Sequence, residues 1–446
     1  MRIAYVVGGF PVISETFVVN QIAGMVARGC HVDIFATSAG TTARLPEAVE
    51  RYRLMERVHR LDAPRNYLLR LYRTLLLLLI YGWRAPGVVM RSVNVARYGR
   101  SAATLGLLYA VLTLIRLGTR RYDVIHAQFG TYGPLALRLV ETGALRSEIV
   151  TSFRGYDATK YLQANPHAFA ALFQKGKLFL PVSHALARRI VEAGCDPAKV
   201  HVHHSGIECA RFRYLERKRP ADEATSIVMI GRLVEKKGIG YGIQAIAHVI
   251  ASGRALSCTI IGEGPLRVEL ERLIRELGID AHVRIVGSKS HDEVIQVLAQ
   301  SHILIAPSIT AADGDEEGIP NTLKEAMAMG LPVISTVHAG IPELVEDGVS
   351  GFLVPEHDVE ALADRLRLLV DHPETWAAMG SAGRRRIEAE FDIDRLNDEL
   401  LILYKSMLET PEPHTLDGDT SASQSRASLP AGGTGRYKHS EGARPH

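Results

Sequence analysis

Cysteine is scarce in this chain of 446 residues, which contains four cysteines. Cys30, Cys195, Cys209 and Cys258 lie far apart and form no C-x-x-C pair. This pattern excludes a disulfide framework and a cysteine-based zinc site. It predicts reduced thiols in a cytoplasmic protein.

Long apolar runs and nucleotide fingerprints are also missing. The longest apolar run, Thr74 to Trp83, is too short to span a bilayer, and Met1-Arg2 leads straight into a predicted strand, so we expect no signal peptide. No Walker loop occurs. Gly262-Glu263-Gly264-Pro265 is not a dinucleotide fingerprint, because Arg267 stands where the third glycine should be.

The charge is nearly balanced overall but uneven along the chain. There are 52 Lys and Arg against 49 Asp and Glu, a net charge of +3, so we expect no nucleic-acid partner. From Arg51 to Arg121, however, the chain has fourteen arginines, no lysine and two acidic residues, Glu56 and Asp62. A basic surface is therefore expected in this segment.

Apolar runs of strand length alternate with helical segments in both halves. This pattern predicts an α/β fold with two doubly wound, Rossmann-like domains that face each other across a cleft. The expected parts are residues 1–207 as a first domain with a basic, leucine-rich helical insertion at about 65–120, 208–225 as a linker, 226–391 as a second domain, 392–409 as a C-terminal helix, and 410–446 as a tail too poor in aliphatic residues to fold.

The stretch with the richest chemistry runs from Asp313 to Pro342. A predicted strand, His302 to Ser308, leads into an acidic loop that ends at Glu317, and Thr322 opens a helix that contains Glu325. The carboxyl ends of parallel strands are where such sheets bind ligands, and a helix N-terminus suits a phosphate. Two alternatives remain open: Thr322-x-x-Glu325 can be a capping box, and the acidic run can be a solvated loop or a weak cation site.

The second half opens with a strand, Ser226 to Ile230, followed by GRLVEKKG. Arg232 and Lys237 lie five residues apart across a strand-to-helix loop, so they can clamp a diphosphate, Arg232 through its planar fork and Lys237 as a point charge. The alternative is ordinary surface charge on a loop.

In the first half, Gly8-Gly9 follows a strand, Ile3 to Val7, and can let a phosphate or a sugar approach the backbone. A tight turn is the alternative. Helix signals follow from Ser14 to Arg28.

Histidines in the first half sit on predicted strands. His126 lies at the end of the strand Tyr122 to Gln128, where a lone histidine is usually structural. A further predicted strand, Val200 to His204, carries three histidines that face opposite ways, so we expect them to be structural and predict no metal site.

The segment from residue 65 to 120 is predicted to form leucine-rich helices studded with arginine. A basic amphipathic helix that lies in the interface suits contact with an anionic membrane leaflet. The alternative is a pair of packed helices with a solvated arginine face.

Three motifs resemble one family. The E-x7-E segment from Glu317 to Glu325 is similar to that of retaining GT-B glycosyltransferases of family 4, and especially to the branch of the colanic-acid exopolysaccharide enzymes. GRLVEKKG is similar to the family's donor-phosphate motif, and FPVISETFVVNQI resembles the opening motif of the exopolysaccharide branch. The resemblance covers roughly residues 1 to 408.

The resemblance implies a GT-B fold and a nucleotide-sugar donor, UDP- or GDP-linked, with no metal or other cofactor. It implies that Glu317 binds the hydroxyls of the sugar, and that the C-terminal helix returns to the first domain. The donor-binding residues it implies are Arg232, Lys237, Gly262, Asn321, Thr322 and Glu325, and the acceptor-side residues are Gly9 and Glu15.

One position departs from the family pattern. Where the family has F-H-G-x-D, this chain has Phe153-Arg154-Gly155-Tyr156-Asp157. Arginine stays protonated and cannot act as a base, but it can hold a diphosphate or stabilise a leaving group. His126 is the nearest candidate for an imidazole. Arg154, His126 and Asp157 therefore join Glu317 as candidate catalytic residues.

The expected function is retaining transfer of a hexose to a lipid-linked saccharide, in exopolysaccharide or cell-surface polysaccharide synthesis. The enzyme would be cytoplasmic and peripheral on the inner face of the cell membrane. Two alternatives are an isomerase like the nucleotide-sugar 2-epimerases and a non-catalytic scaffold that binds nucleotide sugar.

Overall fold

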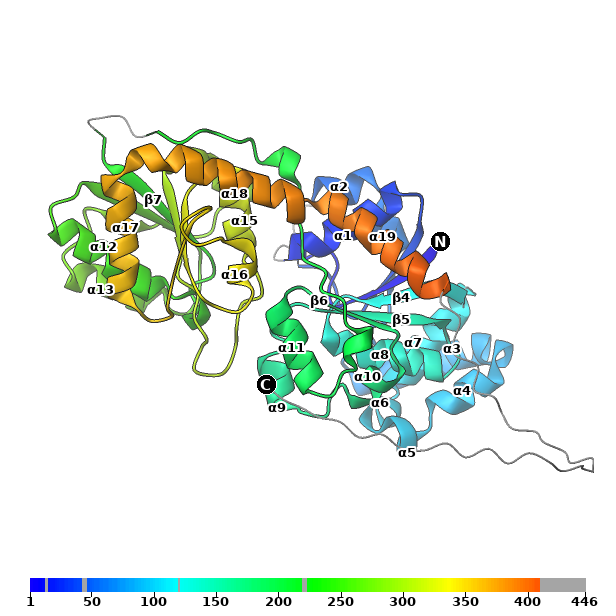
Figure 1. Ribbon diagram of the computed structural model, residues 1–446. Helices are drawn as coiled ribbons and strands as arrows, with labels where there is room; N and C mark the ends of the chain where they lie inside the picture. The colour runs from blue at the N-terminus through cyan, green and yellow to red at the C-terminus, as the bar shows by residue number, and fades with distance from the viewer. Residues whose placement is uncertain (13–14, 42–45, 119–120, 219–222, 410–446) are drawn as a thin grey trace, which may run out of the picture. The chain divides into compact units, whose positions relative to one another are not determined.

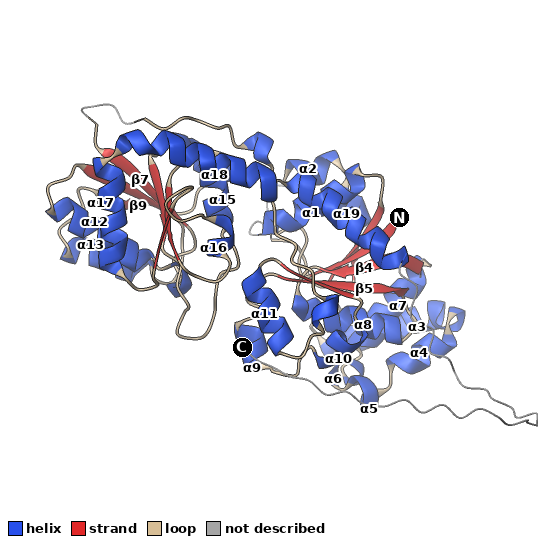
Figure 2. Ribbon diagram, in the orientation of Figure 1, coloured by secondary structure: helices blue, strands red, loops and turns tan. Residues whose placement is uncertain are grey.

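The computed structural model describes residues 1–12, 15–41, 46–118, 121–218 and 223–409. These residues build two six-stranded parallel sheets, each with helices on its faces (Figures 1 and 2). The predicted α/β class with two doubly wound sheets is thereby confirmed. The predicted tail, 410–446, lies outside the described residues.

The first sheet has the strand order β3-β2-β1-β4-β5-β6. Its strands are nearly continuous apolar runs because helices cover both faces. Among the helices are α1 (Thr16–Ala27), α8 (Gly133–Glu141) and α11 (His184–Glu192); Ser14, expected at the start of α1, is not among the described residues. The strands are β1 (Arg2–Val7), β2 (His31–Ala36), β3 (Val58–Arg60), β4 (Arg121–Ala127), β5 (Arg146–Phe153) and β6 (Leu178–Pro181).

The second sheet has the order β12-β11-β10-β7-β8-β9. Its strands are β7 (Thr225–Ile230), β8 (Leu256–Ile261), β9 (Val283–Ile285), β10 (Ile303–Ala306), β11 (Val333–Thr336) and β12 (Phe352–Val354). Its helices include α12 (Ile239–Ala251), α13 (Arg267–Glu276), α14 (His291–Gln300), α15 (Asn321–Ala328), α17 (Val359–Asp371) and α18 (Trp376–Glu390). The strand order reverses between β7 and β10, and the crevice at such a switch point is where these sheets bind ligands.

The last helix, α19 (Ile393–Glu409), packs against α1 (Figure 1). Arg28, the residue after α1, donates from Nε to Asp398 at 2.7 Å, and Leu400 and Tyr404 of α19 are buried in the apolar core beside the first sheet. The Tyr404 hydroxyl lies 2.6 Å from Nδ1 of His126 on β4. The helix that ends the second half is therefore part of the core of the first.

Helices fill the segment from residue 67 to 117: α3 (Tyr67–Tyr81), α4 (Pro86–Ser92), α5 (Val95–Tyr98), α6 (Arg100–Ala103) and α7 (Gly106–Leu117). Most of α7 is buried, whereas Thr74 is the one fully buried residue of α3. In the described ranges, no helix combines the length and the apolar character needed to cross a bilayer.

The predicted strand from Val200 to His204 is wrong. Val200 forms an isolated bridge with Phe179, and His201 N–H donates to Phe179 O at 2.9 Å. A regular parallel ladder would also need an N–H from Pro181, which proline lacks, so no second bridge forms although His203 N–H donates to Pro181 O at 2.9 Å.

The three histidines of this segment bind separate partners, as expected for structural roles. His201 contacts Glu399, while His203 and His204 contact the carbonyl oxygens of Leu396 and Val182. No group of three or more His, Cys, Asp or Glu side chains placed to hold a metal occurs in the part of the chain that the structure describes.

Replacing Tyr404 with Phe tests the junction between α19 and the first sheet. The change leaves buried His126 without one hydrogen-bond partner, so we expect Tyr404→Phe to lower the free energy of unfolding by about 1–3 kcal/mol. The measurement is urea unfolding followed by circular dichroism.

The matched control is Tyr72→Phe, at a tyrosine that is 64% exposed. It should change the free energy by less than about 0.5 kcal/mol. Equal effects of the two substitutions would show that the Tyr404 hydroxyl does not stabilise this junction.

Candidate functional site

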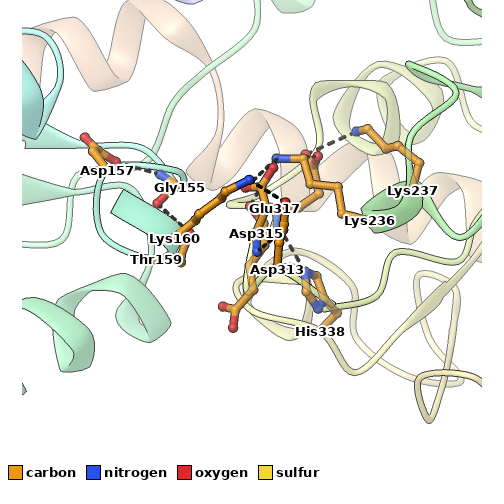
Figure 3. Close-up of polar contacts among 11 residues, drawn as sticks. Gly155, Asp157, Thr159, Lys160, Lys236, Lys237, Asp313, Asp315, Glu317 and His338 are labelled. Atoms are coloured by element: carbon orange, nitrogen blue, oxygen red, sulfur yellow. Dashed lines mark hydrogen bonds and ion pairs between the residues drawn. The ribbon is translucent and has the colours of Figure 1, made fainter. Parts of the chain in front are cut away.

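Two loops meet at the carboxyl edge of the second sheet. β7 and β10 are parallel neighbours, with Leu304 beside Val228. The Arg232–Lys237 loop therefore leaves the sheet next to the acidic loop that follows β10. Figure 3 shows the side chains that the two loops bring together.

Gly262 lets the backbones after β7 and β8 pack tightly. Its φ is +153°, and a Cβ atom built on it would lie 1.8 Å from the carbonyl oxygen of Gly231. Any other residue would push this loop away from the sheet edge. Gly262 therefore lies next to the loop that carries Arg232, and its role beside a ligand stays a prediction.

The centre of the site is the carboxylate of Glu317 between two lysines (Figure 3). Its oxygens lie 3.1 Å from Lys237 Nζ and 3.4 Å from Lys236 Nζ. Burial alone would raise the pKa of Glu317, but the two ammonium groups outweigh it and lower the pKa to about 2. Glu317 is therefore ionised at neutral pH.

Lys236 is a site residue that the motif analysis missed. It is 8% exposed, and its ammonium group also donates to Asp315 at 3.1 Å and to the carbonyl of Glu316 at 3.3 Å. The sequence signal was the acidic loop itself, because four carboxylates on one loop need more cations than Lys237 supplies.

Each carboxylate of the acidic loop has a basic partner. Besides the lysine pairs of Asp315 and Glu317, Asp313 pairs with Lys160 and Glu316 with Arg189. Lys160 begins α9 (Lys160–Ala164) and Arg189 lies on α11, so both belong to the first half of the chain. Ion pairs therefore hold the loop, which is not simply solvated, and the weak cation site stays an open alternative.

His338 is a second residue that the sequence did not point to. Its Nε2 accepts from the backbone N–H of Glu317 at 3.1 Å, and its Nδ1 lies 2.6 Å from the carboxylate of Glu356. These bonds assign the proton to Nδ1. His338 thereby fixes the backbone from which the Glu317 side chain projects.

The start of α15 is uncapped. No side chain accepts from its first turn, and the Thr322 hydroxyl is buried with no partner in the described structure, so the capping box is not formed. The N–H groups of Asn321 and Thr322 have no intrahelical acceptor, which suits an anion there.

Glu325 is a buried carboxyl group without a bonding partner. It is 9% exposed, and no hydrogen bond or ion pair to it exists among residues 1–12, 15–41, 46–118, 121–218 and 223–409. Burial raises its pKa to about 7, against the opposing charges of Lys324 and Arg211. A buried carboxyl group without a partner is suited to accept hydrogen bonds from the hydroxyl groups of a ligand.

Lys324, beside Glu325, is fully buried and donates to Ser205 O at 2.6 Å and to Ser205 Oγ at 2.9 Å. Burial lowers its pKa to about 7. It ties α15 to the end of the first half. No motif pointed to it, because a lysine on a predicted helix is ordinarily a solvated residue.

Arg154 is held by neutral groups. It donates from Nε to Gln128 O at 3.0 Å and from Nη2 to the side-chain oxygens of Gln128 (2.7 Å) and Gln21 (3.2 Å), and its guanidinium lies over the Phe17 ring. Burial lowers its pKa to about 10, so it remains a cation at neutral pH. No carboxylate of the described residues bonds to it, so this charge is available to an anion.

Asp157 anchors the loop of Arg154. Its carboxylate accepts from the backbone N–H groups of Gly130, Arg154, Gly155 and Ala158 at 2.7–3.1 Å. Because both carboxylate oxygens already accept backbone hydrogen bonds, Asp157 positions the loop.

The expectation that His126 supplies an imidazole to a reacting sugar does not fit the structure. His126 is fully buried, with Nδ1 bonded to Tyr404 and Nε2 to Ser152 Oγ at 2.8 Å. Burial lowers its pKa well below the ordinary value. It belongs to the core contact with α19.

Gly9 and Glu15 lie on the loop after β1 and at the start of α1. A Cβ atom on Gly9 would lie 2.7 Å from Ala39 O, so close packing is reason enough for this glycine. Burial raises the pKa of Glu15, while the charge of Arg154 opposes the rise. Glu15 therefore lies within electrostatic reach of Arg154.

The pH dependence of stability tests the Glu317 cluster. The folded pKa of about 2 lies below the ordinary value of 4.5, so the cluster stabilises the fold above about pH 4.5 and loses this effect as the pH falls toward 2. Between pH 6 and pH 3, we expect the free energy of unfolding to fall less for Glu317→Gln than for wild type. The difference between the two proteins would reach about 3 kcal/mol only when the pH is below the folded pKa of Glu317.

Urea unfolding at pH 6, 4 and 3 measures this difference. Glu269→Gln, at an exposed glutamate of α13, is the control and should follow wild type. A Glu317→Gln variant with the pH profile of wild type would contradict the ion pairs.

Both halves of the chain match known families. Residues 14–211 match the family described as Glycosyltransferase Family 4, and residues 211–386 match Glycosyl transferases group 1. Together the two matches cover every strand of the two sheets except β1.

Curated relatives match over almost their whole length. The putative colanic acid biosynthesis glycosyltransferase WcaL of Salmonella typhimurium is 36% identical over 417 residues, which cover 91% of this chain and all of the relative. The amylovoran biosynthesis glycosyltransferase AmsK of Erwinia amylovora is 35% identical, over 88% of this chain and 96% of the relative.

Solved structures share the fold. Anabaena Alr3699/HepE in complex with UDP superposes with a TM-score of 0.67 at 19% identity, over 91% of this chain and all of that one. The lipopolysaccharide outer core galactosyltransferase WaaB has a TM-score of 0.61 at 18% identity, over 91% of this chain and all of that one. The resemblance stated from the motifs is thereby confirmed. The chain belongs to the GT-B glycosyltransferases of family 4, with the colanic acid and amylovoran enzymes of exopolysaccharide biosynthesis.

Proposed function

We propose that the protein transfers a hexose from a UDP- or GDP-sugar to a lipid-linked saccharide, with retention of anomeric configuration. The observation that carries this proposal is the Glu317 carboxylate, ion-paired with Lys236 and Lys237 at the carboxyl edge of the second sheet, with unpaired Glu325 on the adjoining helix. Glu317 suits the hydroxyl groups of the sugar and Glu325 suits those of the ribose, on opposite sides of a diphosphate.

The diphosphate binds to groups that the structure leaves exposed or uncapped. Arg232 is exposed on the loop after β7, and Lys237 bonds only to Glu317 among the described residues. The first-turn N–H groups of Asn321 and Thr322 add the positive end of the helix dipole. This set neutralises the departing nucleotide with side chains and backbone amides, without a metal. Structures of Anabaena HepE with UDP, and with UDP and glucose, support the donor class.

Donor binding replaces the contact between Lys237 and Glu317. A phosphate oxygen of the donor pairs with the Lys237 ammonium group in place of Glu317. The Glu317 carboxylate then accepts hydrogen bonds from hydroxyl groups of the hexose. Lys236 keeps its bonds to Asp315 and to the Glu316 carbonyl, so it holds the loop in place during this exchange. We therefore assign Lys236 a positioning role and Lys237 a binding role.

Retention follows from a front-face transfer. Asp313, Asp315 and Glu316 are engaged in ion pairs, and Glu317 is assigned to the hydroxyl groups of the hexose, so none is offered as a nucleophile to the back of the sugar. The departing phosphate oxygen takes the proton of the acceptor hydroxyl as the new glycosidic bond forms and the bond to phosphate breaks. The Arg154 cation stabilises the negative charge that develops on the leaving group.

A lipid-linked acceptor and attachment to the inner face of the cell membrane explain the helices of residues 67–117. Leu68 and Leu79 of α3 are 75% and 79% exposed, and Trp83, in the turn after α3, is 71% exposed, in a segment without acidic residues. An apolar helix surface beside arginines suits an anionic leaflet.

Transfer of labelled sugar from a panel of UDP- and GDP-sugars to a lipid extract of the host membrane tests the function. We expect a lipid-soluble product of retained configuration by NMR, and a loss of at least about 100-fold in transfer by Glu317→Gln. Because Lys237 stays available to phosphate, the variant should bind UDP or GDP as tightly as wild type or more tightly.

The control is Asp313→Asn, an exposed acid of the same loop, which should keep most of the activity. Donor converted without any lipid product would indicate the isomerase, and binding without turnover would indicate the scaffold. Full transfer by Glu317→Gln would contradict the assignment of the sugar site.

The pKa of Glu325 predicts a pH dependence of donor binding. The ionised carboxylate is the better acceptor for ribose hydroxyls, and with a pKa of about 7 it is mostly protonated at pH 6 and mostly ionised at pH 8. We expect the affinity for a nucleotide sugar to rise about tenfold over this range. Titration calorimetry measures this affinity. The ligand is the intact nucleotide sugar, because its diphosphate is esterified at both ends and loses no proton between pH 6 and pH 8.

Lys324 has a pKa in the same range, so the variant Glu325→Gln decides which group is responsible. The variant should bind weakly, with an affinity independent of pH. A slope that survived in Glu325→Gln would assign the titration to Lys324.

A further inference from the structure

A pocket lies among the helices of the first half, apart from the Glu317 site in the fold. It has a volume of about 370 Å³ and is formed by the end of β3, one side of α3 and one side of α7. Three arginines, Arg60, Arg73 and Arg116, surround it together with Tyr109, over the side chains of Leu76 and Leu77.

The charge of this pocket is not balanced from within. Arg60 pairs with Asp62 at 2.6 Å, but Arg73 and Arg116 have no ion pair with any described residue. The sequence has no acidic residue between Asp62 and Asp123. Two arginines that line one pocket without a counter-charge favour an anion, and their planar guanidinium groups fit the oxygens of a phosphate.

Most other arginines of the segment are already engaged. Arg70 donates to the carbonyls of Pro64 and Thr104, Arg91 donates to that of Thr142, Arg97 pairs with Glu141, and Arg84 lies over aromatic rings. Arg73 and Arg116 are thus set apart from the general basic surface by their place in a pocket.

The surroundings of the pocket are apolar. Leu76, which lines it, is 43% exposed, and on the same helix Tyr72, Leu75 and Leu79 are 64%, 49% and 79% exposed. Binding of a small soluble anion would not explain why apolar side chains are exposed beside the pocket. An anion with a hydrocarbon chain satisfies both features.

We propose that this pocket binds the phosphate of an anionic membrane phospholipid, with an acyl chain against the exposed side of α3. The phosphate oxygens accept from Arg73 and Arg116, and the Tyr109 hydroxyl, which lies near Arg60, is a further donor. The inference rests on the proposed membrane attachment and deepens it, because it adds a defined head-group site to a general electrostatic attraction.

Vesicle flotation of the full chain tests the site. The vesicles contain phosphatidylcholine alone or phosphatidylcholine with phosphatidylglycerol, and the proteins are wild type, Arg73→Gln with Arg116→Gln, and the control pair Arg65→Gln with Arg100→Gln. Arg65 and Arg100 are exposed in the same acid-free segment and do not line the pocket. Both double variants lose two positive charges, so the general attraction falls equally.

We expect the pocket variant to lose about tenfold more affinity than the control variant for vesicles with phosphatidylglycerol. All proteins should bind poorly to phosphatidylcholine alone. Equal losses by the two variants would overturn the site and leave only surface charge. Release from the vesicles by millimolar inorganic phosphate, in wild type alone, would show a site for free phosphate and would also overturn it.

A third vesicle, with a polyprenyl diphosphate at the same total charge, separates head group from acceptor. If the pocket variant lost affinity for this vesicle alone, the pocket would belong to the acceptor and the phospholipid assignment would be wrong. Sugar transfer to acceptor in detergent is measured in parallel. Wild type that transfers but does not bind vesicles would overturn the lipid site and leave the proposed transfer intact, whereas vesicle binding without transfer would do the reverse.

Discussion

The site depends on one interaction, the Glu317 carboxylate between Lys236 and Lys237. A carboxylate at this depth would hold a proton without those ammonium groups, and two lysines at this depth would repel each other without the carboxylate. The cluster therefore holds the loops after β7 and β10 together before any donor arrives. The two lysines differ in their contacts. Lys236 is also bonded to Asp315 and to the Glu316 carbonyl, whereas we propose that Lys237 exchanges Glu317 for a phosphate.

The other contacts of the site are arranged around this cluster. His338 fixes the Glu317 backbone, Asp157 fixes the loop of Arg154, and Lys324 joins α15 to Ser205. A carbonyl of the Arg154 loop lies 3.0 Å from where a Cβ on Gly318 would be, so the departure at Arg154 stands beside the acidic loop. Because Arg154 is bonded to glutamines and to a backbone carbonyl, its charge is kept. A role of Arg154 at the leaving group stays a prediction.

Much of this could be predicted from the sequence. The alternation of strands and helices fixed two doubly wound sheets, because each apolar run needs helices on both of its faces. The strand-end motifs put Arg232, Lys237 and Glu317 on loops at one sheet edge, since the carboxyl ends of parallel strands share an edge. The predicted strand at residues 200–204 failed because its ladder needed an N–H that Pro181 lacks.

Local pattern thus determined the fold class and the loops that carry the chemistry, because both depend on residues close together in the chain. Only the tertiary structure decided which side chains are paired. Lys236 and Lys324 look like solvated lysines in sequence and are buried, and His126 stands at a strand end but is enclosed by Tyr404, 278 residues away. Burial and partnership come from distant segments, and no local spacing encodes them. The unbalanced arginines between α3 and α7 show the same division: composition predicts a basic segment, while packing selects the two that form a pocket.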